Sequence, residues 1–495
     1  MSENSKGLPE GLPRAVGLLG GGVIGGGWAA RFLLNGVDVR LYDPAPNALE
    51  RVQEMLANAR RAYRRLTSAP MPTEGSLTLV KSVEEAVREV DLVQESVPER
   101  LDFKQQLLAA VGRAATPGTL ICSSTSGFRP SLLQAEMDNP ECLLVAHPFQ
   151  PVYMLPLVEL CAGQRTAPEM VERAAAIFRA VGMHPLVVRK EVDGFIANRL
   201  NESISREALW LVHDDVATLG EIDDAIRFSW ALRRAAIGSH RVVNGAVGMR
   251  DTIERWAFKW PWSRITDKPE IDRAFIEKVA EQADAIVKAD PLPVHPEQKR
   301  DDLLVAVLHA LRSQDYGPGK TLASWEQGLR DRAPQPLTDG SGAVLTPTLE
   351  MTSDWLDRNG HVSETRFLEL CGMGCSSVLK YAGSNDEYRS KYGKYFTAET
   401  HLTHLRELYA GDCVQVVTQV LGIDDKRLHL FYVIMREGDE LPAATGEQIL
   451  IHVDAQTGRG GPVKGNVRER LMELARLHAE LPRPERAGAS IRMHR

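Results

Sequence analysis

Between residues 15 and 190, short apolar runs alternate with stretches whose apolar positions recur at helical spacing. The segment GWAARFLLNG (27–36) has this helical spacing and ends at a glycine, a common helix stop signal. Regular alternation of strands and helices is typical of a doubly wound, parallel α/β sheet. We therefore expect residues 1–190 to form such a domain, with strands at AVGLLG (15–20), VDVRLYDP (37–44), VDLVQESV (90–97), TLICSST (119–125) and CLLVAHP (142–148).

The pattern changes after residue 190. Long helical stretches, such as FIANRLNESISREALWLVHD (195–214), predict an all-α domain over residues 191–330. Residues 331–346 are rich in Pro, Gly, Asp and Ser, which is typical of a linker. One helical segment (363–383) then precedes four strand-like segments, which predicts an α+β domain over residues 347–482. A tail at residues 483–495 would follow; the four strand-like segments are 395–408, 413–423, 428–437 and 447–456.

Composition narrows the classes of function. The chain has 495 residues, 43% hydrophobic and 25% charged, which is ordinary for a globular protein of several domains. A net charge of −7 provides no basic footprint for nucleic acid, and no apolar run is long enough for a bilayer span or a signal peptide. The six cysteines lack metal-site spacing, so we expect free thiols, with Cys371 and Cys375 on one helix face. These features predict a cytoplasmic protein without a metal site.

A glycine-rich turn follows the first expected strand. Residues 20–25 read GGGVIG, which matches G-x-G-x-x-G, and Asp43 ends the next strand 23 residues after Gly20. Such glycines let the backbone approach a pyrophosphate at a helix N-terminus, and an aspartate there accepts bonds from a ribose hydroxyl, so NAD is favoured over NADP. The alternative is a tight turn without a ligand. The predicted cofactor-binding residues are Gly20, Gly22, Val23, Ile24, Gly25, Asp43 and Glu99.

Three further motifs place polar residues at the ends of apolar runs: STSGF (124–128), HPFQPVYMLPLVEL (147–160) and DGFIANRL (193–200). Each alone is explained by a turn, a capped loop or a polar helix position. Together, and in this order, they resemble the 3-hydroxyacyl-CoA dehydrogenase superfamily over about residues 15–325. The resemblance implies an active site of Ser126, His147, Glu159 and Asn198, with a glutamate twelve residues beyond the histidine.

These residue types suit the oxidation of a secondary alcohol. His147 would remove the hydroxyl proton as a general base, because imidazole titrates near neutral pH. Glu159 would hold the imidazole tautomer and stabilise the imidazolium. Ser126 and Asn198 would bind and orient the substrate oxygen.

The segment after the histidine and residues 226–265 are similar to the L-carnitine 3-dehydrogenase branch of this superfamily. The resemblance implies a small substrate with a hydroxyl between a carboxylate and a trimethylammonium group. That cation needs aromatic faces, for which Phe149, Tyr153 and Trp230 are the candidates. We interpret the aromatic stretch ERWAFKWPW (254–262) mainly as packing or a subunit interface, with a cation cage as the alternative.

The segment SDWLDRNGHVSETRFLELCG (353–372) resembles the opening of hotdog-fold thioesterases, including betainyl-CoA thioesterases. The resemblance implies that Asp357, three residues before Gly360, acts as a general base or a nucleophile. We expect N–H groups of residues 360–362 to polarise the thioester carbonyl, with His361 and Glu399 as candidate helpers. The alternative is that Asp357 serves only the turn before the helix.

The combined prediction is a bifunctional enzyme with a Rossmann-type sheet, an all-α domain and a hotdog domain. It would oxidise L-carnitine to 3-dehydrocarnitine with NAD and hydrolyse betainyl-CoA to glycine betaine and CoA. A separate enzyme would carry out the transfer to CoA between these steps. The alternative is a 3-hydroxyacyl-CoA dehydrogenase with a non-catalytic hotdog dimerisation module. Expected partners are a quaternary-ammonium substrate, a CoA thioester and further copies in a homodimer or higher homo-oligomer, with no nucleic acid and no membrane.

Overall fold

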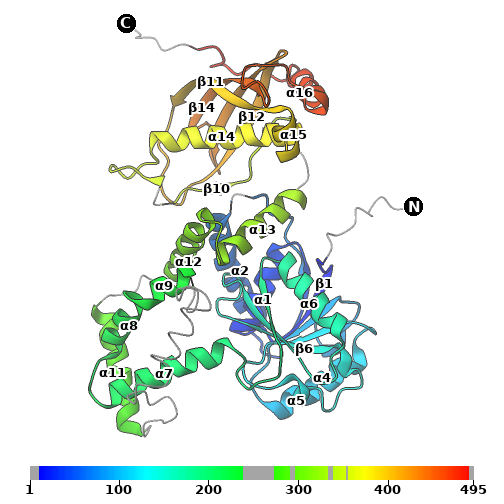
Figure 1. The fold of residues 1–495 in the computed structure, drawn as a ribbon, viewed down its shortest axis with the longest axis vertical. Coiled ribbons are helices and arrows are strands. Elements are labelled where there is room, and N and C mark those ends of the chain that lie inside the picture. The colour runs from blue at the N-terminus through cyan, green and yellow to red at the C-terminus, as the bar shows by residue number, and fades with distance from the viewer. Residues whose placement is uncertain are drawn as a thin grey trace. The chain divides into compact units, whose positions relative to one another are not determined.

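The computed structural model describes residues 11–67, 69–237, 272–289, 296–332, 338–339, 341–352 and 355–489 (Figure 1). The aromatic stretch at 254–262 lies outside the described residues, so its role stays a prediction. The chain divides into two compact units, one of residues 1–66 and 72–328 and the other of residues 67–71 and 329–495. The expected sheet domain and the expected helical domain therefore belong to one unit.

An eight-stranded sheet forms the centre of the first unit, in the order β3-β2-β1-β4-β5-β6-β7-β8. Neighbouring strands are parallel except β6 and β7, which pair antiparallel. The order 3-2-1-4-5-6 is that of a Rossmann sheet and confirms the predicted fold class, although the reversal at β7 was not expected. The strands are β1 (Ala15–Leu19), β2 (Asp38–Tyr42), β3 (Leu77–Leu79), β4 (Leu92–Glu95), β5 (Leu120–Ser123), β6 (Leu143–Pro148), β7 (Leu157–Ala162) and β8 (His184–Val188).

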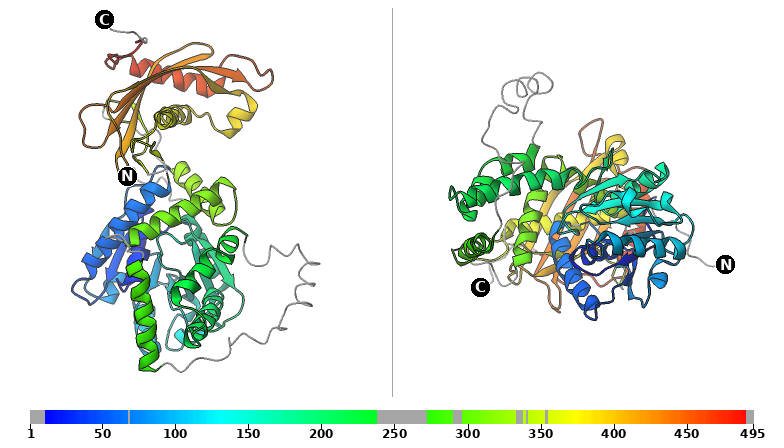
Figure 2. Two further views of the ribbon diagram at one scale, coloured as in Figure 1. Left: turned by 90° about the vertical axis from the view of Figure 1, so that its left-hand side faces the viewer. Right: turned by 90° about the horizontal axis from the view of Figure 1, so that it is seen from below.

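Helices lie alongside this sheet (Figure 2), and in helix α1 every residue from Gly25 to Leu34 is buried. Its residue Arg31 is buried, and the guanidinium donates to Val152 O (2.8 Å), Val181 O (2.9 Å) and Leu155 O (3.2 Å). Burial removes water from the guanidinium and lowers the pKa of Arg31. The three carbonyl oxygens replace the hydrogen bonds that water would otherwise make. The helices around the sheet are α1 (Val23–Leu34), α2 (Ala48–Leu66), α3 (Val83–Val87), α4 (Leu101–Ala114), α5 (Pro130–Leu133), η1 (Pro140–Cys142) and α6 (Pro168–Ala180).

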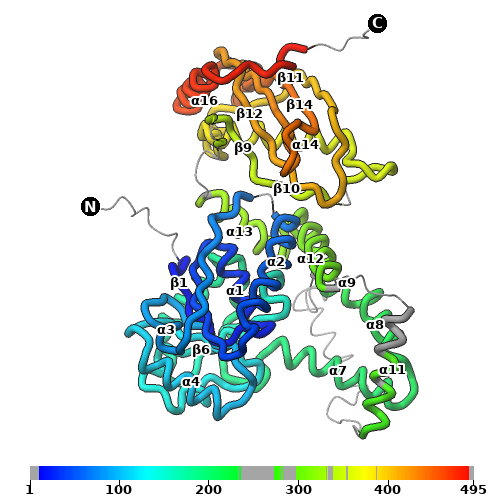
Figure 3. Tube along the Cα trace, turned by 180° about the vertical axis from the view of Figure 1, so that it is seen from behind, coloured from blue at the N-terminus to red at the C-terminus, as the bar shows by residue number. Residues whose placement is uncertain are grey.

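The helical part of the first unit begins with α7, which leads away from the sheet (Figures 1 and 3). Its described core is small and consists of Val212, Ile222 and Phe275. Helix α13 returns to the sheet domain, where Trp325 Nε1 donates to Asn35 Oδ1 at 2.7 Å. The helices are α7 (Ala197–His213), α8 (Leu219–Arg227), α9 (Trp230–Ile237), α11 (Arg273–Ala289), α12 (Pro296–Ser313) and α13 (Pro318–Arg332).

The second unit is an antiparallel sheet that curves around the long helix α14 (Figure 1). Its strand order is β10-β12-β13-β14-β11, with β9 paired to β12. Strand β9 lies inside the expected linker 331–346, so that prediction was wrong at its end, where two residues join the sheet. The elements are β9 (Val344–Leu345), β10 (Leu349–Glu350), α14 (Glu364–Tyr381), α15 (Asp386–Lys391), β11 (Gly393–His404), β12 (Cys413–Ile423), β13 (Arg427–Arg436), β14 (Ala444–Asp454) and α16 (Gly465–His478).

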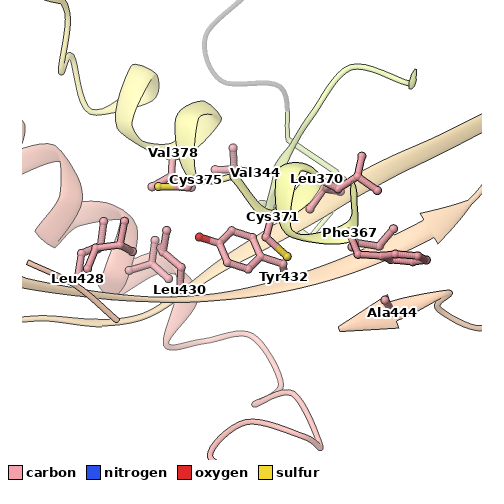
Figure 4. Close-up of a cluster of buried hydrophobic side chains, with 14 of the residues drawn as sticks. Val344, Phe367, Leu370, Cys371, Cys375, Val378, Leu428, Leu430, Tyr432 and Ala444 are labelled. Atoms are coloured by element: carbon pink, nitrogen blue, oxygen red, sulfur yellow. The ribbon is translucent and has the colours of Figure 1, made fainter. Parts of the chain in front are cut away.

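Glycines set the close approach of α14 to its sheet. A Cβ on Gly374 would lie 2.6 Å from Thr418 Oγ1, and one on Gly446 would lie 2.5 Å from Cys371 Sγ. Cys371 and Cys375 share the buried face of α14 with neighbouring apolar side chains and meet Tyr432 of β13 (Figure 4). Both thiols are free and buried, as predicted, and burial raises the pKa of Cys375 to about 11. In the described ranges, no helix has both the length and the apolarity that crossing a membrane requires.

Two candidate active sites

The glycine turn joins β1 to α1. Gly20 has φ +97°, and a Cβ there would lie 2.7 Å from Ser96 O. A Cβ on Gly25 would lie 1.8 Å from Gly20 O, so no side chain fits between the helix and the turn. A Cβ on Gly22 would meet no atom within 4 Å. The open side of the turn thus lies at the N-terminus of α1, where Val23 is 52% exposed and Ile24 follows, and this shape fits a pyrophosphate.

Asp43 follows β2 and lies directly beside this turn. Its Oδ2 accepts from Gly21 N at 2.6 Å, and its Oδ1 accepts from Ala45 N at 2.8 Å. Arg51 Nη2 lies 3.6 Å from Oδ2. Because each carboxylate oxygen has two lone pairs, both oxygens keep an acceptor position that a ribose hydroxyl could use. The residues present therefore fit the adenosine ribose of NAD.

His147 and Glu159 form a buried pair. They lie opposite each other in the antiparallel ladder of β6 and β7, so their twelve-residue spacing is a cross-strand register. His147 Nδ1 lies 2.9 Å from Glu159 Oε2, and the two residues are 4% and 0% exposed. This contact holds the Nδ1–H tautomer and leaves Nε2 without a partner among the described residues.

Glu159 also joins the sheet to α7. Its Oε1 accepts from the N–H groups of Ile196 and Ala197, at 3.0 Å each. Burial by itself would raise the pKa of Glu159, but the hydrogen bonds from His147, Ala197 and Ile196 outweigh burial and lower it. Glu159 is therefore an ionised carboxylate that connects the imidazole to the start of the helical part.

Ser126 and Asn198 meet next to this junction. Asn198 Nδ2 donates to Ser126 O at 3.1 Å, and Ser126 itself is exposed. Glu99 Oε1 accepts from the N–H groups of Ser126 (3.0 Å) and Gly127 (3.1 Å). The structure thus brings the four residues together in two hydrogen-bonded pairs, His147 with Glu159 and Ser126 with Asn198, which meet where Ala197 and Asn198 are neighbours at the start of α7. Glu99 therefore fixes the backbone of the loop that carries Ser126, and its contact with NAD stays a prediction.

Two phenylalanines flank the imidazole. The ring of Phe149 lies 4.7 Å from that of His147, edge to face, and the ring of Phe195 lies 5.5 Å away. Phe195 is fully buried with φ +50°, a left-handed conformation that costs about 1–3 kcal/mol in a non-glycine residue. Phe195 was not among the predicted site residues. Its position directly after Gly194, in the same motif as Asn198, could have indicated it.

Tyr153 and Trp230 make other contacts. Tyr153 is 1% exposed; its hydroxyl donates to Asp301 Oδ2 (2.6 Å) and accepts from Arg300 Nη2 (3.0 Å). Burial, followed by the carboxylate of Asp301, raises the pKa of Tyr153. The ring of Trp230 is covered by the guanidinium of Arg234, 4.1 Å from the ring centroid. Of the three predicted substrate aromatics, the structure places only Phe149 against the imidazole of His147, and the substrate roles of the other two stay predictions.

The Asp357 turn precedes α14 in the second unit. Asp357 is exposed, and its Oδ1 accepts from the N–H groups of Asn359 (2.8 Å) and His361 (3.3 Å). The N–H of Asn359 is the largest cause that lowers the pKa of Asp357. Gly360 has φ +83° and closes the turn. The carboxylate is therefore ionised and held by its own loop.

The N–H groups that were expected to polarise a thioester are already bonded inside the protein. Gly360 N donates to Asp357 O (3.1 Å), Val362 N donates to Leu408 O (2.8 Å), and His361 N donates to the Asp357 carboxylate (3.3 Å). That expectation was wrong, because the turn uses these donors to hold itself and to pair with a neighbouring loop. Ser363 N donates to Trp355 O (2.9 Å), and only the donors after it, Glu364 N and Thr365 N, have no acceptor among the described residues.

The candidate helpers also have other contacts. His361 Nε2 lies 3.5 Å from Glu407 Oε2, and its ring packs edge to face against Tyr409. Glu399 is exposed on β11, next to a bulge in the pairing of β11 with β14. Their help in catalysis therefore stays a prediction.

Comparisons with known proteins identify both halves. The family model of the 3-hydroxyacyl-CoA dehydrogenase NAD binding domain matches residues 15–192, the model of the C-terminal domain matches 194–283, and a thioesterase-like superfamily model matches 351–471. An L-carnitine dehydrogenase/betainyl-CoA thioesterase of Rhizobium meliloti (strain 1021) is 41% identical over 484 residues, which are 96% of this chain and 97% of that protein. The chain belongs to this family of fused enzymes.

Two further similarities concern the dehydrogenase part of the fused enzyme. An L-carnitine dehydrogenase of Pseudomonas aeruginosa is 48% identical over 299 residues, which are 59% of this chain and 92% of that protein. A solved structure of 5-formyl-3-hydroxy-2-methylpyridine 4-carboxylic acid 5-dehydrogenase, an NAD+-dependent dismutase, has a TM-score of 0.50 and 27% identity, and the match covers 60% of this chain and 98% of that chain. The NAD-binding fold of the dehydrogenase half is thereby shown.

The fused enzyme also has a polar cluster that sequence reasoning missed. Ser124 Oγ accepts from Gln94 Nε2 (2.7 Å) and Trp28 Nε1 (3.1 Å) and lies 2.9 Å from Ser96 Oγ. These hydrogen bonds connect α1 and β4 to Ser124, two residues before Ser126 in the loop after β5. Within the described residues, no group of three or more His, Cys, Asp or Glu side chains is placed to hold a metal ion.

Proposed function

We propose that the first unit oxidises the 3-hydroxyl of L-carnitine to a ketone with NAD. The observation that carries this proposal is the buried His147–Glu159 pair, which Ala197 and its neighbour Asn198 join to Ser126, in a unit whose glycine turn is shaped for NAD. Similarity to named L-carnitine dehydrogenases over the whole dehydrogenase half supports the choice of substrate.

The chemistry follows from the protonation states of His147 and Glu159. NAD, when bound, supplies the acceptor for the hydride that leaves the substrate carbon. His147 Nε2 takes the hydroxyl proton, while Nδ1–H stays hydrogen-bonded to Glu159, whose charge stabilises the imidazolium. Ser126 and Asn198 orient the hydroxyl oxygen, and Phe149 offers a face to the trimethylammonium group.

A substrate panel tests this function. The full chain is mixed with NAD and either L-carnitine or 3-hydroxybutyryl-CoA, and NADH is followed by absorbance. Reduction of NAD with L-carnitine supports the proposal. Activity with the CoA ester alone would replace it with the alternative, a 3-hydroxyacyl-CoA dehydrogenase.

The second unit hydrolyses betainyl-CoA in this proposal. Asp357 removes a proton from water, and the water oxygen bonds to the thioester carbon. The C–S bond then breaks to give glycine betaine, and the leaving CoA thiolate takes the proton from Asp357, which restores the carboxylate. The N–H groups of Glu364 and Thr365, which have no acceptor among the described residues, are the donors for the carbonyl oxygen. Release of CoA thiol from betainyl-CoA, measured with a thiol reagent, tests this activity. Intact assembly without hydrolysis would favour the non-catalytic dimerisation module.

We also propose a homodimer or higher homo-oligomer in the cytoplasm. The described helical part of the first unit exposes apolar side chains that a second copy could cover, on α7 and in the loops on either side of α8: Leu200 (64% exposed), Val216 (67%) and Phe228 (77%). The free state of all six cysteines fits a reducing compartment. Light scattering of the Phe228→Ser variant tests the assembly, which should shift toward monomer.

A further inference from the structure

A cavity of about 400 Å³ opens in the second unit, at the end of α14 that is remote from Asp357. It lies between the residues that follow α14, the short helix α15 and the start of α16. None of the residues assigned above to hydrolysis contributes to its lining. The lining residues that matter here are Glu387, Tyr388, Lys391, Tyr392, Lys464 and Arg470.

The cavity has an excess of positive charge. Lys391, Lys464 and Arg470 line it, against a single carboxylate from Glu387 among its lining residues. Lys464 Nζ lies 3.2 Å from Asp454 Oδ2, but Lys391 and Arg470 have no carboxylate partner among the described side chains. Lys391 lies over the ring of Tyr392, 5.0 Å from its centroid, and Arg470 donates only to the Tyr381 carbonyl, at 3.4 Å. Two cations therefore line the cavity without an ion-pair partner among the described residues.

Backbone donors add to this charge. Helix α16 begins at Gly465, its N-cap residue Lys464 gives no side-chain bond, and its first turn holds no acidic residue. The first N–H groups of a 14-residue helix are thus left for an external acceptor, beside Lys464 and Arg470. A cavity with unpaired cations and helix N–H groups is suited to a ligand with several negative charges, of which phosphate esters are the best match.

We propose that this cavity binds the phosphate groups of the nucleotide end of CoA. The choice of CoA rests on the proposed thioesterase function; the preference for phosphate esters rests on the cavity alone. The 18 residues of α14 separate the cavity from the Asp357 turn by about 27 Å along the helix. Because of this separation, the bound phosphates do not belong to a thioester that reacts at Asp357 of the same chain. They belong either to a thioester whose reacting end lies at Asp357 of a second copy, or to free CoA.

Calorimetric titration of the full chain with adenosine 3′,5′-bisphosphate and with CoA tests the binding. The double variant Lys391→Gln/Arg470→Gln should weaken both ligands at least 10-fold, because it removes both unpaired cations. The matched control Lys394→Gln/Lys426→Gln removes the same charge from exposed positions outside the cavity and should bind as wild type. Glu387→Gln removes the carboxylate and should tighten binding a few-fold. Unchanged affinity in the double variant, or equal loss in the control, would overturn the proposal.

Hydrolysis assays separate the two sources of the phosphates. If the bound phosphates belong to the substrate, the double variant raises KM for betainyl-CoA and leaves kcat unchanged. If they belong to free CoA, only inhibition by CoA weakens. The titration is repeated in Asp357→Asn, where hydrolysis is expected to be lost. A chain that binds the bisphosphate through Lys391 and Arg470 but does not hydrolyse betainyl-CoA would refute the proposed function and keep this site.

Discussion

The two candidate active sites are built in opposite ways. The dehydrogenase site takes its side chains from the loop after β5, from β6, from β7 and from the start of α7, and its central pair is buried. The thioesterase site takes its carboxylate from an exposed turn, and the donors that hold Asp357 lie two and four residues away in sequence. The dehydrogenase site therefore forms only when the first unit is folded. The thioesterase site is held by the short turn of residues that directly precedes α14.

This difference has a physical consequence. A buried carboxylate such as Glu159 is ionised only because three donors from distant segments replace its lost hydration. Asp357 keeps contact with water and needs little support from the rest of its domain. A substitution at the first site should therefore affect both the chemistry and the stability of the fold, and one at the second should affect the chemistry alone.

The largest expected effect comes from His147→Asn. Loss of the general base should lower kcat/KM for NAD-dependent oxidation of L-carnitine by about 10²–10⁴-fold. NADH formation measures this loss, and thiol release from betainyl-CoA in the same preparation should match wild type. Oxidation at the wild-type rate would remove His147 from the mechanism.

Asp357→Asn should lower thioester hydrolysis by about 10²-fold or more, since the amide cannot take a proton from water. The asparagine carbonyl can still accept from Asn359 N and His361 N, so the turn and the melting temperature should be kept. Asp357→Ala is the matched variant that also removes the acceptor. If Asp357→Asn keeps hydrolysis and Asp357→Ala loses it, Asp357 only holds the turn.

Glu159→Gln should change how stability depends on pH. The pKa of Glu159 is lowered in the folded state from its usual 4.5, so its ionised form stabilises the fold above about pH 4.5. This contribution is lost as pH falls below 4.5 through the folded-state pKa. Calorimetric melting of the full chain at pH 7 and pH 4 measures it, in the transition that NAD shifts upward.

The variant should show a smaller drop in melting temperature between pH 7 and pH 4 than wild type. Glu169→Gln, at an exposed position on α6, is the control and should keep the wild-type drop. An unchanged drop in Glu159→Gln would contradict the account of a carboxylate held ionised by buried donors.

The smallest effects are expected from substitutions of the aromatic candidates for cation binding, of which Phe149→Leu should have the larger effect. Loss of one cation–π contact, worth about 0.5–2 kcal/mol, should raise KM for L-carnitine about 2–30-fold. Trp230→Leu should raise KM less, because Arg234 already covers its ring. Initial-rate kinetics measure both. A larger effect at Trp230 would mean that the ring leaves Arg234 for the substrate.

Local patterns were predicted well because their causes are local. The expected strand 413–423 coincides with β12, and the glycine turn, the first helix and Asp43 lie where the motif indicated. The turn is set by residues within six positions, and a strand by its own alternation. Helix α16 was not predicted, although its apolar residues recur at helical spacing.

Contacts between distant segments were predicted less well. The twelve-residue spacing of His147 and Glu159 indicated a relation, but the antiparallel reversal of β7 that makes it a direct contact was not expected. Tyr153 was placed near the substrate because it is close to His147 in sequence, yet its hydroxyl pairs with Asp301, 148 residues away. Nearness along the chain does not determine direction in space.

The sequence by itself determined the two-enzyme organisation, the NAD turn and the position of the acidic turn before α14, and it named the candidate catalytic residues, whose roles stay predictions. Only the tertiary structure decided that Glu159 joins the imidazole to α7, that Phe195 is locked against the imidazole, and that the N–H groups of residues 360–362 are already used. Motifs record which chemistry a segment can supply. Hydrogen-bond partners depend on burial and on which segments meet, and both are set by the packing of the whole unit.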